Sequence, residues 1–312
     1  MTKRNINYIL NYTHFGEIIQ GVFSSVSKNR CAISMPIYIG RGKKSVKKNF
    51  DDNFKLANIK CHVEYKKNSK NLKFAPKKYK KSLKLLNIIL LKYKKKLKGN
   101  IQIKNKIPIS KGLGSSTVNM VGVAKILKLK LNLKLSNDEI LKLCSQIEPT
   151  DPILKKDITL FSTIEGKVKK KFKFKFPKLV IFGFDTKPGT IGINTIKMGQ
   201  PKYNKSEISF FNKSIKKLLS LKYYDKNTIN LISKESLKIN QKHVPKKYLN
   251  YLFNIEKKMS NDFIIGAHSG TMLGFAYDYN KLLKTKINKF DLMVLNRISR
   301  LYKAPIKKYI YV

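Results

Sequence analysis

A strand, a glycine-containing turn and the start of a helix follow one another in the middle of the chain, and this succession restricts the folds available to it. Residues 100–107 alternate as a strand does, and residues 118–127 have the apolar periodicity of a helix. Residues 108–117, between them, read P-I-S-K-G-L-G-S-S-T. Glycine takes up backbone conformations that a Cβ forbids, and the N–H groups of a first helical turn attract anions. The pattern predicts a phosphate-binding loop at a helix N-terminus.

Two familiar phosphate loops are excluded by the residues present. A Walker A loop requires a lysine directly after its last glycine, and Gly114 is followed by Ser115. A dinucleotide fingerprint requires a third glycine, where this chain has Thr117. The alternative to a phosphate loop is a plain strand–turn–helix junction in which the hydroxyl side chains only cap the helix.

Three further motifs accompany the loop in a fixed order. Residues 15–21 read F-G-E-I-I-Q-G, residues 148–151 read E-P-T-D, and residues 266–274 read G-A-H-S-G-T-M-L-G. Together with the loop, and over about residues 16–278, they resemble the GHMP kinase superfamily, most closely the bacterial L-threonine kinases of cobalamin biosynthesis. The resemblance implies an α+β, GHMP-kinase-like two-lobed fold with a ribosomal-S5-like N-terminal half and a ferredoxin-like C-terminal half. It also implies ATP and Mg²⁺ as cofactors.

The resemblance assigns roles to individual residues. Ser116 and Glu148 are the expected metal ligands, because carboxylate and hydroxyl oxygens suit Mg²⁺. Asp151 is the expected catalytic residue, which orients or deprotonates the acceptor hydroxyl. The ATP-binding set is Pro108, Lys111, Gly112, Leu113, Gly114, Ser115, Ser116 and Thr117, and the substrate-binding set is Glu17, Gln20, His268 and Ser269.

Each acidic or substrate-binding assignment has a purely structural alternative. Glu148 can be a surface carboxylate at a helix end, and Asp151 can belong to a simple turn before Pro152. The first motif along the chain, residues 15–21, can be a turn at a strand end, and His268 can be a structural histidine. Lys111 either pairs with a phosphate or is one more exposed lysine.

The chain also departs from the family pattern. Residues 12–15, Y-T-H-F, replace the usual P-G-T-C, and Pro152 follows Asp151 where related chains have a small residue. Residues 187–188, K-P, replace part of a Gly-Gly pair. Besides an unchanged kinase, these departures therefore leave two alternatives, a kinase with a different substrate and a protein that has lost kinase activity. His14 belongs to no recognisable pattern.

The formal net charge of +49 over 312 residues raises the question of a nucleic-acid or membrane partner. The basic residues are nearly all lysine; arginine, the preferred fork for phosphates and base edges, occurs only at positions 4, 30, 41, 297 and 300. We therefore interpret the charge as a codon bias, part of which steers ATP into a cleft. The expected partner is a small-molecule substrate, with no nucleic acid and no membrane, and the oligomeric state is not indicated.

The cysteines Cys31, Cys61 and Cys144 have no metal-ligand spacing and follow no secretory signal, so we expect reduced thiols and a cytoplasmic protein. The most apolar run, residues 85–91, is much shorter than the roughly 20 residues of a membrane helix.

Periodicity alone supports an α+β protein, and the resemblance implies an N-terminal ATP-binding lobe, placed at residues 1–170, and a C-terminal lobe at 171–312. Strands are expected at 6–12, 22–26, 31–39, 59–65, 167–176, 179–184, on both sides of His268 and at 309–312, and helices at 77–97, 136–147, 206–221, 227–240, 246–259 and 291–302.

The leading functional hypothesis is an ATP-dependent kinase that converts L-threonine to O-phospho-L-threonine. A kinase for another small alcohol, such as homoserine, and a non-catalytic basic nucleic-acid-binding protein on the same fold are the alternatives.

Overall fold

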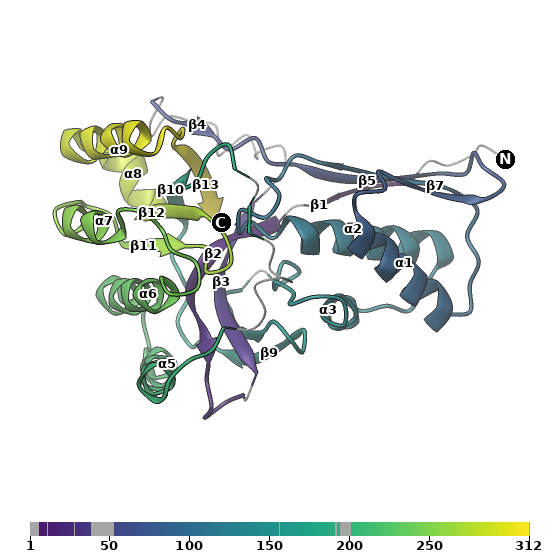
Figure 1. The fold of residues 1–312 in the computed structure, drawn as a ribbon, viewed down its shortest axis with the longest axis horizontal. Coiled ribbons are helices and arrows are strands. Elements are labelled where there is room, and N and C mark those ends of the chain that lie inside the picture. The colour runs from purple at the N-terminus through teal and green to yellow at the C-terminus, as the bar shows by residue number, and fades with distance from the viewer. Residues whose placement is uncertain are drawn as a thin grey trace.

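The structure, a computed structural model, describes residues 6–10, 12–27, 29–38, 53–155, 157–190, 192–193 and 201–311. It has two β-sheets with helices packed against them, and the molecule is elongated, with the smaller sheet toward one end and the C-terminal helices at the other (Figure 1). Asn11, Ile39 and Val312, which fall in predicted strands, lie outside the described residues.

The smaller sheet carries the first helices of the chain on one face (Figure 1). The side chains of β5 (Cys61–Lys66) and β7 (Gly99–Asn105) alternate between buried and partly exposed, as expected for strands covered on one side. A Cβ on Gly122 of the long central helix would stand 2.4 Å from a methyl carbon of Val63, so this helix lies directly on the sheet. The strands, in spatial order, are β1 (Ile6–Leu10), β5 (Cys61–Lys66), β7 (Gly99–Asn105) and β6 (Leu72–Ala75), and the helices on this sheet are α1 (Lys80–Lys92) and α2 (Ser115–Leu131). The next helix, α3 (Asn137–Ser145), packs against α1 and α2 and against strand β9 (Lys167–Lys171) of the larger sheet.

The larger sheet joins residues from both halves of the chain. Its order is β4 (Lys55–Leu56), β13 (Lys307–Tyr311), β10 (Leu179–Asp185), β12 (Met272–Asp278), β11 (Phe263–Gly266), β2 (Tyr12–Val22), β3 (Arg30–Tyr38), β8 (Thr159–Ser162) and β9 (Lys167–Lys171). The C-terminal strands meet the N-terminal ones where Gly266 pairs with Glu17. Because this sheet continues across residue 170, the division into two lobes at that point stays a prediction.

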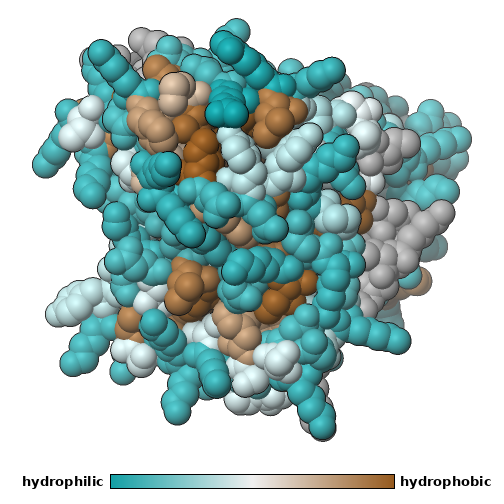
Figure 2. Space-filling model, turned by 60° about the vertical axis from the view of Figure 1, so that its left-hand side comes forward, coloured by the Kyte–Doolittle hydropathy of each residue, from teal (hydrophilic) through white to brown (hydrophobic). Residues whose placement is uncertain are grey.

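A row of helices covers the outer face of the larger sheet (Figure 1). The side chains on the view of Figure 2 are mostly hydrophilic, with apolar side chains in small separate groups. No helix in the described part of the chain is long and apolar enough to cross a membrane. The helices are α5 (Lys205–Ser220), α6 (Lys226–Asn240), α7 (Leu249–Glu256), α8 (Tyr279–Thr285) and α9 (Lys289–Tyr302).

Most predicted elements are confirmed, and the main error concerns the first motif. Residues 22–26 are mostly a turn rather than a strand, because β2 runs through residues 12–22 and includes both Gly16 and Gly21. The first motif therefore lies inside a strand and not in a turn at its end. The predicted capping box is confirmed: Ser136 and Glu139 cap each other's backbone N–H groups at the start of α3. Four short elements were not predicted, namely β4, β6, β8 and α8.

Candidate active site

The phosphate loop has the backbone that its glycines predict. Ser110, Gly112 and Gly114 have φ angles of 58°, 86° and 65°, in the left-handed region. Gly114 is the N-cap of α2, and no side chain caps the helix there. The first-turn N–H groups therefore lack a side-chain cap, which is the property of an anion site at a helix N-terminus.

The fourth motif along the chain, residues 266–274, packs directly behind this loop. A Cβ on Gly112 would stand 2.1 Å from the Cβ of Ala267, and one on Gly270 would stand 2.3 Å from the carbonyl oxygen of Lys111. That carbonyl oxygen accepts hydrogen bonds from the backbone N–H groups of Thr271 and Met272, at 3.1 and 3.2 Å. The spacing A-H-S-G-T is therefore explained by backbone contact, since only a glycine at positions 112 and 270 allows the two segments to touch.

Ser116 and Glu148 come together beside the N-terminus of α2, which with residues 112–116 is called the helix mouth below. The Ser116 hydroxyl donates a hydrogen bond to one carboxylate oxygen of Glu148, and the Lys81 ammonium contacts the other oxygen. Glu148 is only 7% exposed, so it is not the surface carboxylate of the alternative interpretation. Two hard oxygen donors next to an anion site fit Mg²⁺, which would neutralise phosphate charge there.

The side chain of Asp151 contacts Thr117 in the first turn of α2 and His14 near the start of β2. Its Oδ2 accepts a hydrogen bond from the Thr117 hydroxyl at 3.2 Å and lies 3.2 Å from His14 Nε2. The carboxylate is still 22% exposed, so a ligand can reach it. Burial alone would raise the pKa of Asp151, but the His14 charge, with hydrogen bonds from His14 and Thr117, lowers it below its usual range. Asp151 is therefore ionised at neutral pH, as a proton acceptor must be.

His14 is a site residue that the sequence interpretation missed. Burial lowers the pKa of its imidazole, but the charge and hydrogen bond of Asp151 and the charge of Glu17, 3.6 Å away, outweigh burial and raise it to about 9. The imidazole is therefore positively charged at neutral pH. No local signal in the sequence identifies it, because its partner Asp151 comes from a distant part of the chain.

The ion pair between His14 and Asp151 should make stability fall in alkaline solution. The His14 contribution is fully present below about pH 6.5, the ordinary pKa of histidine, and is lost as the pH rises through about 9. We expect the free energy of unfolding, measured in urea at pH 6 and pH 10, to fall more for the wild-type protein than for His14→Gln. The difference should be on the order of 3 kcal/mol.

The control for that experiment is His62→Gln, which removes a partly exposed histidine from β5. This variant should keep the wild-type pH dependence. Identical losses in wild-type protein and His14→Gln would show that the pair does not form in solution.

Glu17 and His268 form a buried network behind the phosphate loop. A carboxylate oxygen of Glu17 accepts the His268 backbone N–H at 2.7 Å and lies 3.2 Å from its Nδ1, while Ser236 Oγ lies 2.6 Å from its Nε2. His268 is 0% exposed. Both residues therefore support the loop from behind in this structure, and their assignment to substrate binding stays a prediction.

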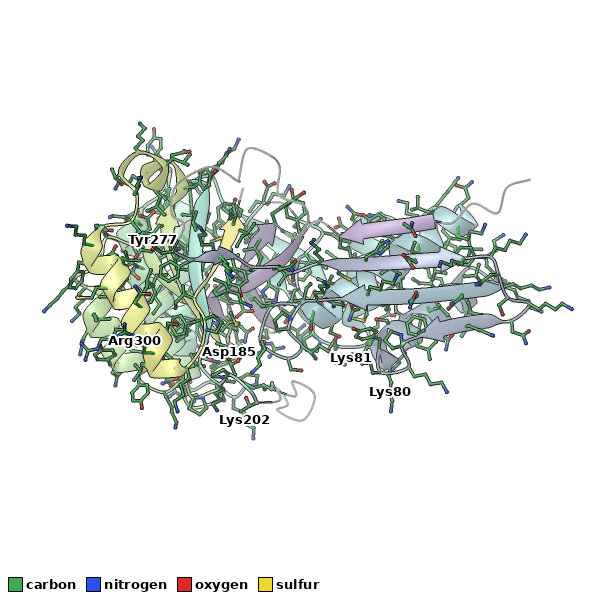
Figure 3. The ribbon with its side chains drawn as sticks, turned by 90° about the horizontal axis from the view of Figure 1, so that it is seen from above. Lys80, Lys81, Asp185, Lys202, Tyr277 and Arg300 are labelled. Atoms are coloured by element: carbon green, nitrogen blue, oxygen red, sulfur yellow. The ribbon has the colours of Figure 1, made fainter. Side chains whose placement is uncertain are left out.

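Lys111 is buried and already paired. Its ammonium lies 2.8 Å from a carboxylate oxygen of Asp185 and donates to the carbonyl oxygen of Lys187 at 2.7 Å. The interpretation as one more exposed lysine is therefore wrong. Figure 3 labels Asp185 at the end of β10 and Lys81 near the start of α1.

One cavity of about 580 Å³ unites the helix mouth with both acids. Of the predicted site residues, Pro108, Lys111, Glu17 and His268 do not line it. The predicted residues on its wall are Gly112, Leu113, Gly114, Ser115, Ser116, Thr117, Glu148, Asp151, Gln20 and Ser269, and those that sequence reasoning missed include His14, Arg30, Lys81 and Thr163.

Comparisons with known proteins agree with this architecture. Residues 79–153 match the family model of the GHMP kinases N terminal domain. No curated protein matches the sequence significantly. Among solved structures, mevalonate kinase of Methanococcus jannaschii superposes with a TM-score of 0.60 at 17% identity, covering 100% of this chain and 99% of the other. Homoserine kinase of Cytophaga hutchinsonii gives a TM-score of 0.64 at 9% identity, with coverages of 100% and 96%.

Residues 79–153 are thus similar to the N-terminal domain of the GHMP kinases, and the whole chain has the fold of solved structures that include a mevalonate kinase and a homoserine kinase. The chain has the two-layered α+β architecture of the GHMP kinases over its whole length. Sequence identities of 9% and 17% show a shared fold and nothing about the acceptor substrate, so the acceptor is inferred from the residues of the site.

Proposed function

We propose that this chain is an ATP- and Mg²⁺-dependent kinase for the hydroxyl of a small amino acid, with L-threonine as the first candidate. The observation that supports it most is the single cavity in which an uncapped helix mouth, Glu148 and Asp151 face the same space. The order of the four motifs favours L-threonine. The fold shared with a homoserine kinase makes homoserine the second candidate.

The proposed reaction uses positioning and charge rather than a covalent intermediate. The N–H groups from Gly112 to Ser116 bind the terminal phosphates. Ser116 and Glu148 would hold Mg²⁺, which would supply positive charge to neutralise the phosphates. The acceptor oxygen forms a bond to the γ-phosphorus while the bond to the β–γ bridging oxygen breaks, and Asp151 takes the hydroxyl proton. His14 keeps Asp151 ionised, and Thr117 orients it.

Two further parts of the proposal follow from composition and burial. Cys31, Cys61 and Cys144 are free and buried, which suits a cytoplasmic protein with reduced thiols. The cavity of about 580 Å³ has the size of a small-molecule site. A small-molecule acceptor is therefore favoured over nucleic acid.

The direct test is turnover by the purified protein. With ATP, Mg²⁺ and L-threonine we expect release of ADP and a phospho-amino acid, identified by mass spectrometry, and a smaller kcat/KM with L-homoserine. Failure with both acceptors would overturn the proposal. Tight nucleic-acid binding with a steep salt dependence, in the absence of turnover, would instead support the binding protein.

A further inference from the structure

Arg30 is a buried arginine on the wall of the cavity, at the first residue of β3. It is 6% exposed. In the described part of the chain, its side chain makes a single hydrogen bond, from Nε to the Thr163 hydroxyl at 3.5 Å, and no carboxylate lies within ion-pair distance. A buried cation without a counter-ion is costly, so its environment calls for an anion that the described residues do not supply.

Two unpaired polar groups accompany Arg30. Gln20 lies diagonally opposite on the same face of the sheet, because Val22 pairs with Arg30 and Gln20 with Ala32. Gln20 lines the cavity, is 4% exposed, and its Nε2 has no acceptor among the described residues. The Tyr203 hydroxyl is also buried without a partner in that part of the chain.

The Tyr203 hydroxyl lies close enough to Arg30 and Gln20 for both side chains to affect its pKa. Burial raises the pKa of its hydroxyl to about 12, while the charge of Arg30 and the side chain of Gln20 act in the opposite direction. Its ring is fixed by Phe211, with ring centroids 5.0 Å apart and nearly perpendicular planes. Arg30, Gln20 and Tyr203 therefore offer hydrogen-bond donors and one positive charge to a ligand, since Gln20 Nε2 and the Tyr203 hydroxyl have no partner among the described residues.

We infer that Arg30, Gln20 and the Tyr203 hydroxyl bind the carboxylate of the acceptor, so that the acceptor is a hydroxy acid and not a carboxylate-free alcohol. A guanidinium matches a carboxylate with two parallel hydrogen bonds, and donors without acceptors are complementary to an anion. This inference rests on the proposed function, since it orients the same acceptor with its hydroxyl toward Asp151.

The alternative anion is a phosphate of ATP, and the contacts of Arg30 disfavour it. Arg30 is held by Thr163, which follows β8, and no hydrogen bond joins its side chain to residues 110–117 in the described structure. The helix mouth provides its own donors for phosphate. Asp151 is close enough for its charge to act on the pKa of Arg30, which burial lowers, so one small ligand can reach both residues.

The test compares Arg30→Gln with the wild-type protein by calorimetric titration without ATP. The two ligands are L-threonine and 1-amino-2-propanol, which keeps the hydroxyl and the amine but lacks the carboxylate. We expect Arg30→Gln to weaken L-threonine binding by about 10- to 100-fold and to leave the weak binding of 1-amino-2-propanol unchanged. Arg300→Gln is the matched control, since Arg300 is exposed on α9, far from α1 (Figure 3).

Arg30→Lys and Gln20→Glu guard against a folding defect. Lysine keeps the charge but loses the planar fork, so binding should weaken less than with glutamine. The Gln20→Glu change introduces a negative charge that repels a carboxylate, while it keeps the size of the side chain. Thermal melting of each variant verifies that it is folded, and the KM for ATP should match that of the wild-type protein.

The outcomes separate this inference from the kinase proposal. Binding of L-threonine that depends on Arg30, without any turnover, keeps the carboxylate site and overturns the kinase. Turnover with an unchanged KM for L-threonine in folded Arg30→Gln overturns the carboxylate site and keeps the kinase. The site is also overturned if the wild-type protein binds neither L-threonine nor L-homoserine, or if the loss in Arg30→Gln falls on ATP.

Discussion

Asp151→Asn should lower kcat with L-threonine by about 100- to 10,000-fold, the range expected for loss of a general base. Asparagine has nearly the same shape, and its oxygen can still accept the hydrogen bond from Thr117. It cannot take a proton, and it removes the negative charge that pairs with His14. Steady-state kinetics with purified protein provide the measurement, and the KM for ATP should change little because the helix mouth is untouched.

The matched control is Asp138→Asn, which removes an exposed aspartate at the start of α3 that pairs with Lys155. Its kcat should equal that of the wild-type protein. An unchanged rate in Asp151→Asn would show that this carboxylate takes no part in proton transfer. A loss of less than about 10-fold would indicate that Asp151 orients the hydroxyl without accepting its proton.

Gly112→Ala should abolish tight ATP binding, raising the dissociation constant by at least about 100-fold. The new Cβ would stand 2.1 Å from the Cβ of Ala267, and the backbone at position 112 has a φ of +86°. A non-glycine residue in such a conformation costs about 1–3 kcal/mol, and the clash must also move the loop off the fourth motif. Titration of a non-hydrolysable ATP analogue, together with thermal melting, measures both effects.

Gly189→Ala controls for the backbone cost alone. Gly189 has a φ of +71°, but a Cβ there would meet no atom within 4 Å. The variant should lose some stability and keep its nucleotide affinity. Adding Ala267→Gly to Gly112→Ala removes the nearest clashing carbon and should restore part of the affinity. Wild-type affinity in Gly112→Ala alone would show that this loop does not hold the nucleotide.

The local signals in the sequence predicted the secondary structure where one element could be identified from its own residues. The capping box of Ser136 and Glu139 and the strand–loop–helix of residues 100–131 are such cases. The prediction failed at residues 22–26, because Gly16 and Gly21 were interpreted as turn residues. Gly16 instead lets β2 approach Gly266, whose carbonyl carbon would lie 2.5 Å from a Cβ, and that neighbour is far away in sequence.

The sequence pointed to the loop and to the two carboxylates that line the cavity, whereas it gave no indication of the cations that contact those carboxylates. His14 is paired with Asp151, and Lys81 with Glu148, across long sequence separations. Neither cation carries a periodic or motif signal, since one is a single histidine in a strand and the other is one of many lysines. Only packing of β2 and α1 around the helix mouth determines which of them meets an acid.

By itself, the sequence predicted the class of site, because a glycine-rich turn before a helix attracts phosphate through its backbone, whatever surrounds it. The tertiary structure decided which side chains complete that site. It buried Glu17 and His268 behind the loop, and it placed the guanidinium of Arg30 on the cavity wall with no carboxylate partner among the described residues. The physical reason is that backbone conformation depends mainly on nearby residues, whereas charge pairing and desolvation depend on segments that only the folded chain brings together.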